Sequence, residues 1–459
     1  MTKNSSINLK RKEIIEKTKK QFKKFVFPSI GAMWFFSLYT MVDGAFVGRG
    51  LGPKALAGVN ISMPYISLLF ALAILISVGS SNIIAYYRGR NEEKVANGYF
   101  TLSLVLITLL GLGLGALAFF NLDFLLRFLK AQGEVYTFAY DYLRVIVPFS
   151  VFFMLAYNLE ILVKADGNPK LSVKVGIIAS LTNIVLDYLF VFVFDYGIKG
   201  AAFATGISQV LGTCIYLGHF LFANANLKFR KINASFVHIF KIIKTGIPEA
   251  LTELSIGFTT FSYNYSIIKY LGLDYITTYS IIMYVNNLVI NTMIAINQGS
   301  QPLVSYHKGQ ENTSSLRELF YLMVRTSLIF GGLFFVLCLV FSKTIVGIFI
   351  DQENLELFSY SVAKLRIFSL GFIITGLSIV ASGYLTASKH PREGLIVSIL
   401  RGYINISLAL FILPKIFGPE YIWLATIVSE LVTLLMVTFI FVRTLDISLK
   451  KDLRALNRA

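Results

Sequence analysis

Two aspartates interrupt apolar segments that are long enough to cross a lipid bilayer. Asp43 lies in the run Tyr39–Phe46, and Asp187 lies in a second run, four residues after Asn183. A charged side chain in hydrocarbon costs at least about 2.5–3.5 kcal/mol unless it is paired or faces water. Neither acid has a Lys or Arg within one helical turn of it in the sequence. If the fold brings the two carboxyl groups together, they would form a site that exchanges one proton or one cation.

The spacing of neighbouring side chains adds possible ligands. Asn183 and Asp187 share one helical face, where an amide oxygen and a carboxylate together suit a hard cation. The segment before the first aspartate places two aromatic rings and a thioether along its helix: Met33, Phe36 and Tyr39. Aromatic rings attract organic cations by about 0.5–2 kcal/mol, and thioethers adapt to varied shapes. Packing and contact with lipid explain such residues equally well.

The composition indicates a membrane protein. Of 459 residues, 56% are apolar and only 15% are charged, and the mean hydropathy is +0.69. Soluble, disordered and fibrous proteins do not have this composition. Twelve apolar runs are each long enough for one helical crossing: 25–48, 57–86, 97–120, 142–162, 172–194, 201–223, 242–268, 277–305, 318–341, 361–386, 394–414 and 421–442. We therefore expect an all-α polytopic membrane protein with twelve transmembrane helices.

Positive charge predicts how these helices are oriented. The net charge is +17, with 42 Lys and Arg residues. Most of them lie in the two tails and in the even-numbered loops with their adjoining helix ends, where we count Arg401 as well. Loops rich in Lys and Arg stay in the cytoplasm. We therefore expect a plasma-membrane protein with both termini in the cytoplasm, and we attribute the charge to orientation and not to nucleic-acid binding.

The sequence contains an internal repeat. A shift of 220 positions aligns Pro28 with Pro248 and Gly79 with Gly299, and shifts of 222 and 221 align Asn183 with Asn405 and Thr205 with Thr426. The repeat predicts two six-helix lobes related by an axis along the membrane normal. The predicted parts are a basic tail (1–24), an N-lobe (25–223), a cytoplasmic linker (224–245), a C-lobe (246–442) and a second tail (443–459). Two such lobes favour a transporter that exposes a central cleft to each side in turn, although channels and membrane enzymes also contain duplicated bundles.

The repeat also separates the acids from the other polar residues. It places Tyr263 opposite Asp43 and Ala409 opposite Asp187, so only the N-lobe carries these acids. A folding requirement common to both lobes would leave acids in both, and we therefore favour a functional role for them. Asn183 and Thr205 have counterparts in the other lobe, so that a shared packing role explains them as well.

Other polar residues in the C-terminal half have simpler explanations. Glu249 follows a proline at an expected helix start, where a carboxylate caps the helix. Glu430 has a polar repeat partner, Gln209, which indicates helix packing. Asn287 and Asn291 belong to a polar stripe that either faces the cleft or makes hydrogen bonds between helices.

Several motifs are missing from the sequence. It contains no phosphate-binding Gly-x4-Gly-Lys-Ser/Thr loop, no Gly-x-Ser-x-Gly elbow and no histidines at metal-ligand spacing. We therefore expect no cofactor and no enzyme activity, and transport driven by an ion gradient or running to equilibrium. Two alternatives stay open. A lipid-linked oligosaccharide flippase would line its cleft with Arg and Lys, which are scarce in these runs, and a polytopic membrane enzyme would need a converging constellation of His, Cys or carboxylate groups.

Five motifs together resemble the multidrug and toxic compound extrusion (MATE) family over nearly the whole chain. They are the segments 43–49 (Asp-Gly-Ala-Phe-Val-Gly-Arg), 51–58 (Leu-Gly-Pro-Lys-Ala-Leu-Ala-Gly), 79–80 (Gly-Ser), 165–169 (Ala-Asp-Gly-Asn-Pro) and 183–187 (Asn-x3-Asp). The resemblance implies a twelve-helix antiporter with two lobes. Such an antiporter expels cationic, amphipathic drugs in exchange for H⁺ or Na⁺, in a lipid membrane and with no oligomer required.

The chain looks most like the DNA-damage-inducible branch of that family. The cation site of that branch implies the following ligands for a proton or, if Na⁺ is the coupling ion, for the metal: Asp43, Asn183, Asp187, Thr205 and, less directly, Tyr142. Ile256 stands where other branches carry an acid, and Pro28 matches a helix that bends during transport. The predicted substrate-binding residues are Met33, Phe36, Tyr39, Met63, Asn287 and Asn291.

Overall fold

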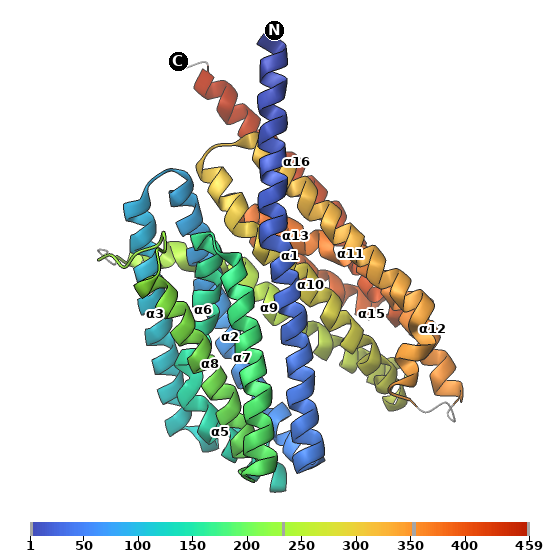
Figure 1. Ribbon diagram of the computed structural model, residues 1–459. Coiled ribbons are helices and arrows are strands. Elements are labelled where there is room, and N and C mark those ends of the chain that lie inside the picture. The colour runs from blue at the N-terminus through green and yellow to red at the C-terminus, as the bar shows by residue number, and fades with distance from the viewer. Residues whose placement is uncertain (1–2, 232–234, 351–354, 457–459) are drawn as a thin grey trace. The chain divides into compact units, whose positions relative to one another are not determined.

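The computed structural model describes residues 3–231, 235–350 and 355–456, and these residues form helices and no β-strand (Figure 1). The α-helices are α1 (Lys3–Leu51), α2 (Pro53–Gly89), α3 (Glu93–Phe120), α4 (Leu122–Phe128), α5 (Gly133–Ile146), α6 (Ser150–Asp166), α7 (Pro169–Asp187), α8 (Gly197–Phe222), α9 (Phe236–Tyr270), α10 (Ile276–Gly309), α11 (Thr313–Gly347), α12 (Leu355–Ser369), α13 (Phe372–Ala387), α14 (Pro391–Ile399), α15 (Ile406–Phe417) and α16 (Ala425–Leu456). Five short segments of other helix types join them. They are the 3-10 helices η1 (Val147–Phe149), η3 (Leu273–Tyr275) and η5 (Pro419–Leu424), and the π-helices η2 (Tyr188–Val193) and η4 (Leu400–Asn405).

Most of these helices can cross a membrane. By length and composition the described residues contain ten candidate spans, or up to eleven if α12 and α13, bent by 40°, form one broken span. A helix satisfies its own backbone N–H and C=O groups, which hydrocarbon cannot do. The run at 242–268 forms α9, which is not among the candidates by composition; it carries Lys241, Lys244, Glu249 and Glu253. The all-α polytopic fold is thus confirmed, and the criterion supports ten or eleven spans where twelve were expected.

Two turns explain the glycine and proline residues in the motifs at 51–58 and 165–169. Gly52 separates α1 from α2 with a φ of 90°, and Pro53 starts α2. Gly167 ends α6 with a φ of 99°, and Pro169 starts α7 after Asn168. Positive φ suits glycine, and proline suits the first helical position. The segment 165–169 is therefore a helix–turn–helix joint whose residues follow from backbone geometry.

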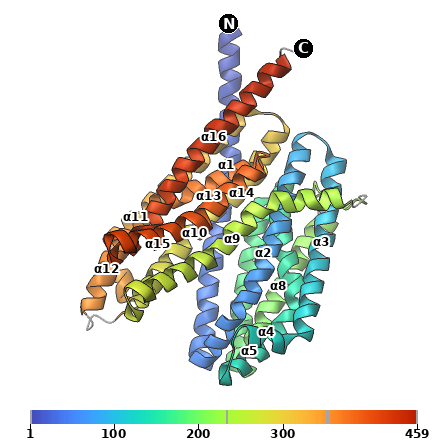
Figure 2. The same cartoon turned by 180° about the vertical axis from the view of Figure 1, so that it is seen from behind.

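The chain divides into two compact units. Unit 1 comprises Met1–Ala250 and Gln298–Leu319, and unit 2 comprises Leu251–Asn297 and Phe320–Ala459, so that α9, α10 and α11 each contribute to both. In unit 1, α1 packs along α7, and α2 packs on α3, α5 and α6. In unit 2, α13 packs on α14 and α16, and α15 packs on α16 (Figure 2). The division into the predicted lobes and linker stays a prediction.

Repeated glycines permit close helix contacts within unit 1. A Cβ added at Gly89 would lie 2.0 Å from the carbonyl oxygen of Tyr306, and one added at Gly309 would lie 2.1 Å from that of Tyr86. The shift of 220 positions matches Gly89 with Gly309 and Tyr86 with Tyr306. The two contacts are thus repeat-related, and they explain why glycine stands at both positions.

Candidate cation-binding site

The two aspartates that the sequence singled out lie together in unit 1. Asp43 comes from α1 and Asp187 is the last residue of α7, the helix on which α1 packs. The two carboxyl groups are near enough to interact directly. Asp187 is 0% exposed, and no hydrogen bond of good geometry reaches either of its carboxyl oxygens among the described residues. The helix packing therefore brings together two acids that are distant in sequence.

No positive side chain balances this pair in the part of the chain that the structure describes. None of the ion pairs there includes Asp43 or Asp187. Two neighbouring carboxylates repel each other in surroundings of low dielectric, so a shared proton or a bound cation stabilises them. The pair has the charge of a cation-binding site.

Two phenol groups border the acids. Tyr39 lies one turn before Asp43 in α1, and its hydroxyl group interacts electrostatically with both carboxyl groups. Tyr142, buried in α5, interacts with both acids and with Tyr39. A tyrosine hydroxyl can donate or accept a hydrogen bond. Three helices thus supply polar groups to this site.

An amide completes the cluster. Asn183 lies one turn before Asp187 in α7, is buried, and donates from Nδ2 to the hydroxyl oxygen of Thr205 in α8 at 3.3 Å. Its Oδ1 has no hydrogen-bond partner among the described residues. Leaving a buried polar atom unpaired costs about 1–3 kcal/mol. Because the unpaired atoms Asn183 Oδ1 and Asp187 Oδ1 and Oδ2 are all acceptors, a proton or a hard cation would satisfy them.

The helix carrying these residues changes its winding at the site. The π-helix η2 begins directly after Asp187. Segments of π-helix are rare, and they occur frequently at functional sites. No local residue pattern predicted this one.

The predicted substrate-binding residues divide between the two units. In unit 1, Phe36 is 40% exposed and meets Tyr39 edge to face at 5.3 Å between ring centroids, and Met63 is 36% exposed. Met33 is partly buried in α1. In unit 2, α10 carries Asn287, which is exposed, and Asn291, which is partly buried. Pro28 lies inside α1, which continues past it.

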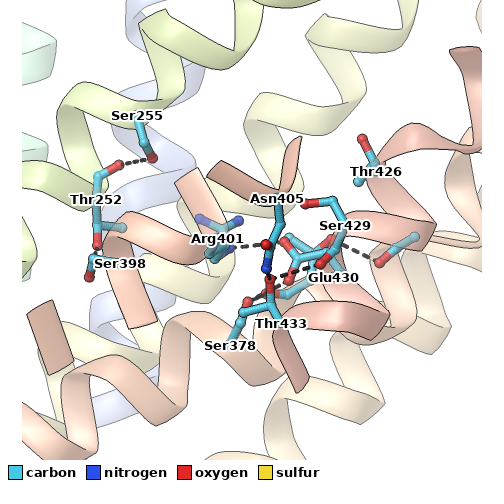
Figure 3. Close-up of polar contacts among 12 residues, drawn as sticks. Thr252, Ser255, Ser378, Ser398, Arg401, Asn405, Thr426, Ser429, Glu430 and Thr433 are labelled. Atoms are coloured by element: carbon cyan, nitrogen blue, oxygen red, sulfur yellow. Dashed lines mark hydrogen bonds and ion pairs between the residues drawn. The ribbon is translucent and has the colours of Figure 1, made fainter. Parts of the chain in front are cut away.

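Unit 2 contains a buried ion pair that the sequence analysis did not predict. Arg401, which we counted with the loops and their adjoining helix ends, lies in η4, ten residues into the candidate span Pro391–Phe417. Its Nε donates to Glu430 Oε1 at 2.9 Å, and Ser378 donates to Oε2 at 2.5 Å (Figure 3). The position of Arg401 well inside the apolar run 394–414 was the signal that should have identified it.

A second acid also differs from its expected role. Glu249 lies inside α9, thirteen residues after the helix begins at Phe236, and so it does not cap a helix start. It is buried in unit 1, and Gln301 donates from Nε2 to its Oε1 at 2.7 Å. The expectation failed because Pro248 does not end the preceding helical segment.

The repeat counterparts of the acid site are hydrogen-bonded within unit 2. Tyr263, opposite Asp43 in the repeat, shares a hydrogen bond of 2.6 Å with the Thr426 hydroxyl group and accepts the Thr426 backbone N–H at 3.0 Å. Asn405, opposite Asn183, donates to Thr433 at 2.9 Å. The unpaired acids thus have no equivalent at the matched positions Tyr263 and Ala409.

Comparisons with known proteins agree on one family. The family model MatE matches residues 28–189 and 248–411. The multidrug export protein MepA of Staphylococcus aureus (strain MRSA252) is 27% identical over 429 residues, which cover 89% of this chain and 92% of that protein.

Solved structures share the fold. A multidrug resistance MATE family transporter of the MOP superfamily, in an outward-facing conformation, superposes with a TM-score of 0.88 at 22% identity, covering 95% of this chain and 97% of that one. A MATE structure in a bent conformation gives a TM-score of 0.87 at 21% identity, with coverages of 96% and 98%. Because the family model matches well over half of the sequence and reaches into both halves of the repeat, the chain belongs to the MatE family and is a membrane transporter, not an enzyme.

Proposed function

We propose that this transporter exports cationic, amphipathic compounds in exchange for H⁺ or Na⁺ by alternating access, in a plasma membrane and with both termini in the cytoplasm. The observation that carries the proposal is the meeting of Asp43 and Asp187, with unpaired oxygens on Asp187 and no ion pair to either acid among the described side chains. The name of the staphylococcal relative, a multidrug export protein, supports export of several drugs.

The coupling ion binds where acceptor oxygens gather. Asp43 and Asp187 hold the proton or Na⁺, and Asn183 Oδ1 supplies a third acceptor. The hydroxyl groups of Thr205 and Tyr142 complete the set. The bound ion neutralises the carboxylates and so removes the negative charge that attracts a cationic substrate. Ion and substrate thus compete for one charge, and this competition couples uptake of the ion to export of the compound.

The substrate contacts aromatic and thioether side chains beside this charge. Phe36 and Tyr39 offer their rings to a cation, and Met33 and Met63 adapt to its shape. Asn287 and Asn291 contribute polar contacts from the C-lobe. Such a wall selects substrates by their positive charge and apolar surface, and it does not require one particular shape.

The repeat supports a division of labour between an N-lobe at 25–223 and a C-lobe at 246–442. The Asp43 counterpart Tyr263 already has its hydrogen-bond partner in Thr426. Ile256 supplies no carboxylate of the kind found in other branches, which favours the DNA-damage-inducible branch. The lobes move about the linker 224–245, and a bend of α1 at Pro28, where proline interrupts the hydrogen-bond ladder, accompanies that motion.

The test replaces each acid by its neutral isostere. We expect Asp43→Asn and Asp187→Asn to lower ion-driven efflux of a cationic dye from proteoliposomes at least about tenfold, because one lost charge-assisted contact has that effect. Asp274→Asn, an exposed residue of η3, is the matched control. Collapsing the proton and the sodium gradients separately identifies the coupling ion. Wild-type coupled efflux in both variants would refute the proposal.

A further inference from the structure

A cavity inside unit 2 has no part in the proposed ion exchange. It encloses about 50 Å³, which is room for a few water molecules. Charged, polar and aromatic side chains share its wall: Tyr263, Tyr279, Asn286, Phe368, Arg401 and Glu430. Apolar side chains, among them Ile256, Met283 and Ile406, form much of the rest of the wall. A largely apolar cavity with a few polar groups suits a ligand whose polar end is bound by those groups.

Arg401 has hydrogen-bonding capacity to spare in this cavity. Its Nε–H is used by Glu430, while the two terminal amino groups of the guanidinium make no hydrogen bond among the described residues. The side chains of Arg401 and Glu430 are 12% and 5% exposed, so little bulk solvent substitutes for a partner. A guanidinium presents its donors in a fork that matches a carboxylate. The terminal amino groups of Arg401 can therefore donate hydrogen bonds to a second carboxylate.

Two neutral side chains of the same wall also have hydrogen-bonding capacity to spare. Tyr279 is buried, and its hydroxyl group has no hydrogen bond of good geometry within the described residues, although Thr260 lies close. Asn286 is buried and makes one weak contact, from Nδ2 to Met283 Sδ at 3.7 Å. Buried polar groups usually find partners. A ligand that enters the cavity would supply them.

The charge balance selects the kind of ligand. Arg401 and Glu430 together are neutral, so a simple cation meets the like charge of Arg401 and a simple anion meets that of Glu430. A zwitterion adds no net charge, and its negative group can lie against Arg401 while its positive group lies against Glu430. Each Glu430 oxygen accepts one hydrogen bond among the described residues and has a second lone pair available.

We propose that this cavity binds the zwitterionic head of a transported compound, with its carboxylate on the terminal amino groups of Arg401 and its ammonium on Glu430. The rings of Tyr263 and Phe368, whose centroids are 5.8 Å apart, add favourable faces for the ammonium. The inference goes beyond export of simple cations and rests on that export only for the transport step. It assigns the carboxylate-bearing head of such a compound to a site formed by Arg401 and Glu430.

The repeat argues against a purely structural role for the pair. The registers that align Asn183 with Asn405 and Thr205 with Thr426 place Ala179 opposite Arg401 and Gln209 opposite Glu430. The other half therefore folds without this ion pair. Because removing two charges from water is costly, a buried ion pair by itself adds little stability.

The experiment compares three forms of one amphipathic amine. The first carries a free carboxylate and is a zwitterion, its methyl ester is a cation, and its N-acetyl acid is an anion. Binding to the purified full-length protein is measured by calorimetry, and efflux is measured in proteoliposomes. Efflux of the ester reports the proposed export function separately, so a failure of export is distinguishable from a failure of this site.

Three variants separate the roles of the two charges. Arg401→Gln with Glu430→Gln removes both charges at once, which avoids leaving one of them buried and unpaired. We expect this double variant to bind the zwitterion about tenfold more weakly, as loss of a charge-assisted contact predicts, and to bind the ester within about twofold of wild type. Glu430→Gln alone should shift the preference from the zwitterion toward the anion. Arg401→Lys keeps the charge and loses the fork, and should weaken zwitterion binding more than ester binding.

A matched control is Arg366→Gln, because Arg366 also donates from Nε, to Ser342 at 2.8 Å, and does not line the cavity. It should leave the order of the three affinities unchanged. Equal loss of zwitterion and ester binding in the Arg401 variants would overturn the proposal, because a structural role affects all ligands alike. Unchanged zwitterion binding in the double variant and in Arg401→Lys would overturn it as well.

Discussion

Replacing Gly246 by alanine tests the close helix packing in unit 1. Gly246 lies inside α9, and a Cβ added there would be 1.8 Å from the backbone carbonyl oxygen of Leu75 in α2. Real Cβ atoms essentially never approach closer than 3.0 Å, so the two helices must separate locally by about 1.2 Å. Forcing extra atoms into a packed contact typically costs about 1–3 kcal/mol. The obstacle is backbone, which cannot turn aside as a side chain can.

The same helix supplies the control for this prediction. Gly257 also lies in α9, and a Cβ added there would meet nothing within 4 Å. Both substitutions gain about 1 kcal/mol of helix propensity. The propensity gain cancels between the two variants, so they should differ by the packing cost of about 1–3 kcal/mol. We therefore expect Gly257→Ala to unfold at or above the wild-type temperature and Gly246→Ala to unfold at a lower temperature than Gly257→Ala, when the detergent-purified proteins are heated and monitored by size-exclusion chromatography. Equal melting temperatures for the two variants would refute the packing argument.

Two further predictions concern hydrogen bonds outside the proposed sites. The Leu227 backbone N–H donates to Asp166 Oδ1 at 2.7 Å, and Asp166→Ala would leave it unpaired at a cost of about 1–3 kcal/mol. Trypsin should then cleave after Lys228 faster than in wild type. An unchanged cleavage rate would contradict the view that this hydrogen bond holds the chain around Leu227 in place. Trp423→Phe removes the hydrogen bond that Trp423 Nε1 donates to the Tyr360 hydroxyl group at 2.9 Å. It should lower the free energy of unfolding by about 1–3 kcal/mol. A melting curve like that of wild type would show that this hydrogen bond adds no stability.

Much of the fold followed from the sequence because hydrocarbon permits few backbone arrangements. Nearly all residues of the predicted apolar runs are helical, since a span must satisfy its own backbone groups; the run 361–386 is interrupted by the turn between α12 and α13. The run in α9 shows the limit of composition: it is not among the candidate spans, although its residues are helical. Hydropathy reports average contact with lipid and not helix formation itself.

The candidate site, too, was predictable from the sequence only in part. Asp43 and Asp187 could be selected because a buried charge is costly wherever the helix packs, and their contact then depends on the packing of α1 on α7. The side-chain distances and the π-helix after Asp187 depend on contacts between helices, which one sequence does not display. Arg401 was missed for a related reason, because counting charges by loop cannot show a partner such as Glu430 on another helix.

The Asp43–Asp187 pair and Glu430 are balanced in different ways, and this difference bears on how transport is coupled. Around Asp43 and Asp187 the charge is unbalanced among the described side chains, so an exchangeable ion must supply the balance. At Glu430 the chain itself supplies the positive charge, from Arg401. Because Arg401 is a side chain, it cannot dissociate and be replaced by an ion from solvent. A site with a built-in counter-ion has no need of a coupling ion, while a site without one depends on it. Under the two proposals made above, Asp43 and Asp187 couple transport to the ion, while Arg401 and Glu430 recognise substrate without one.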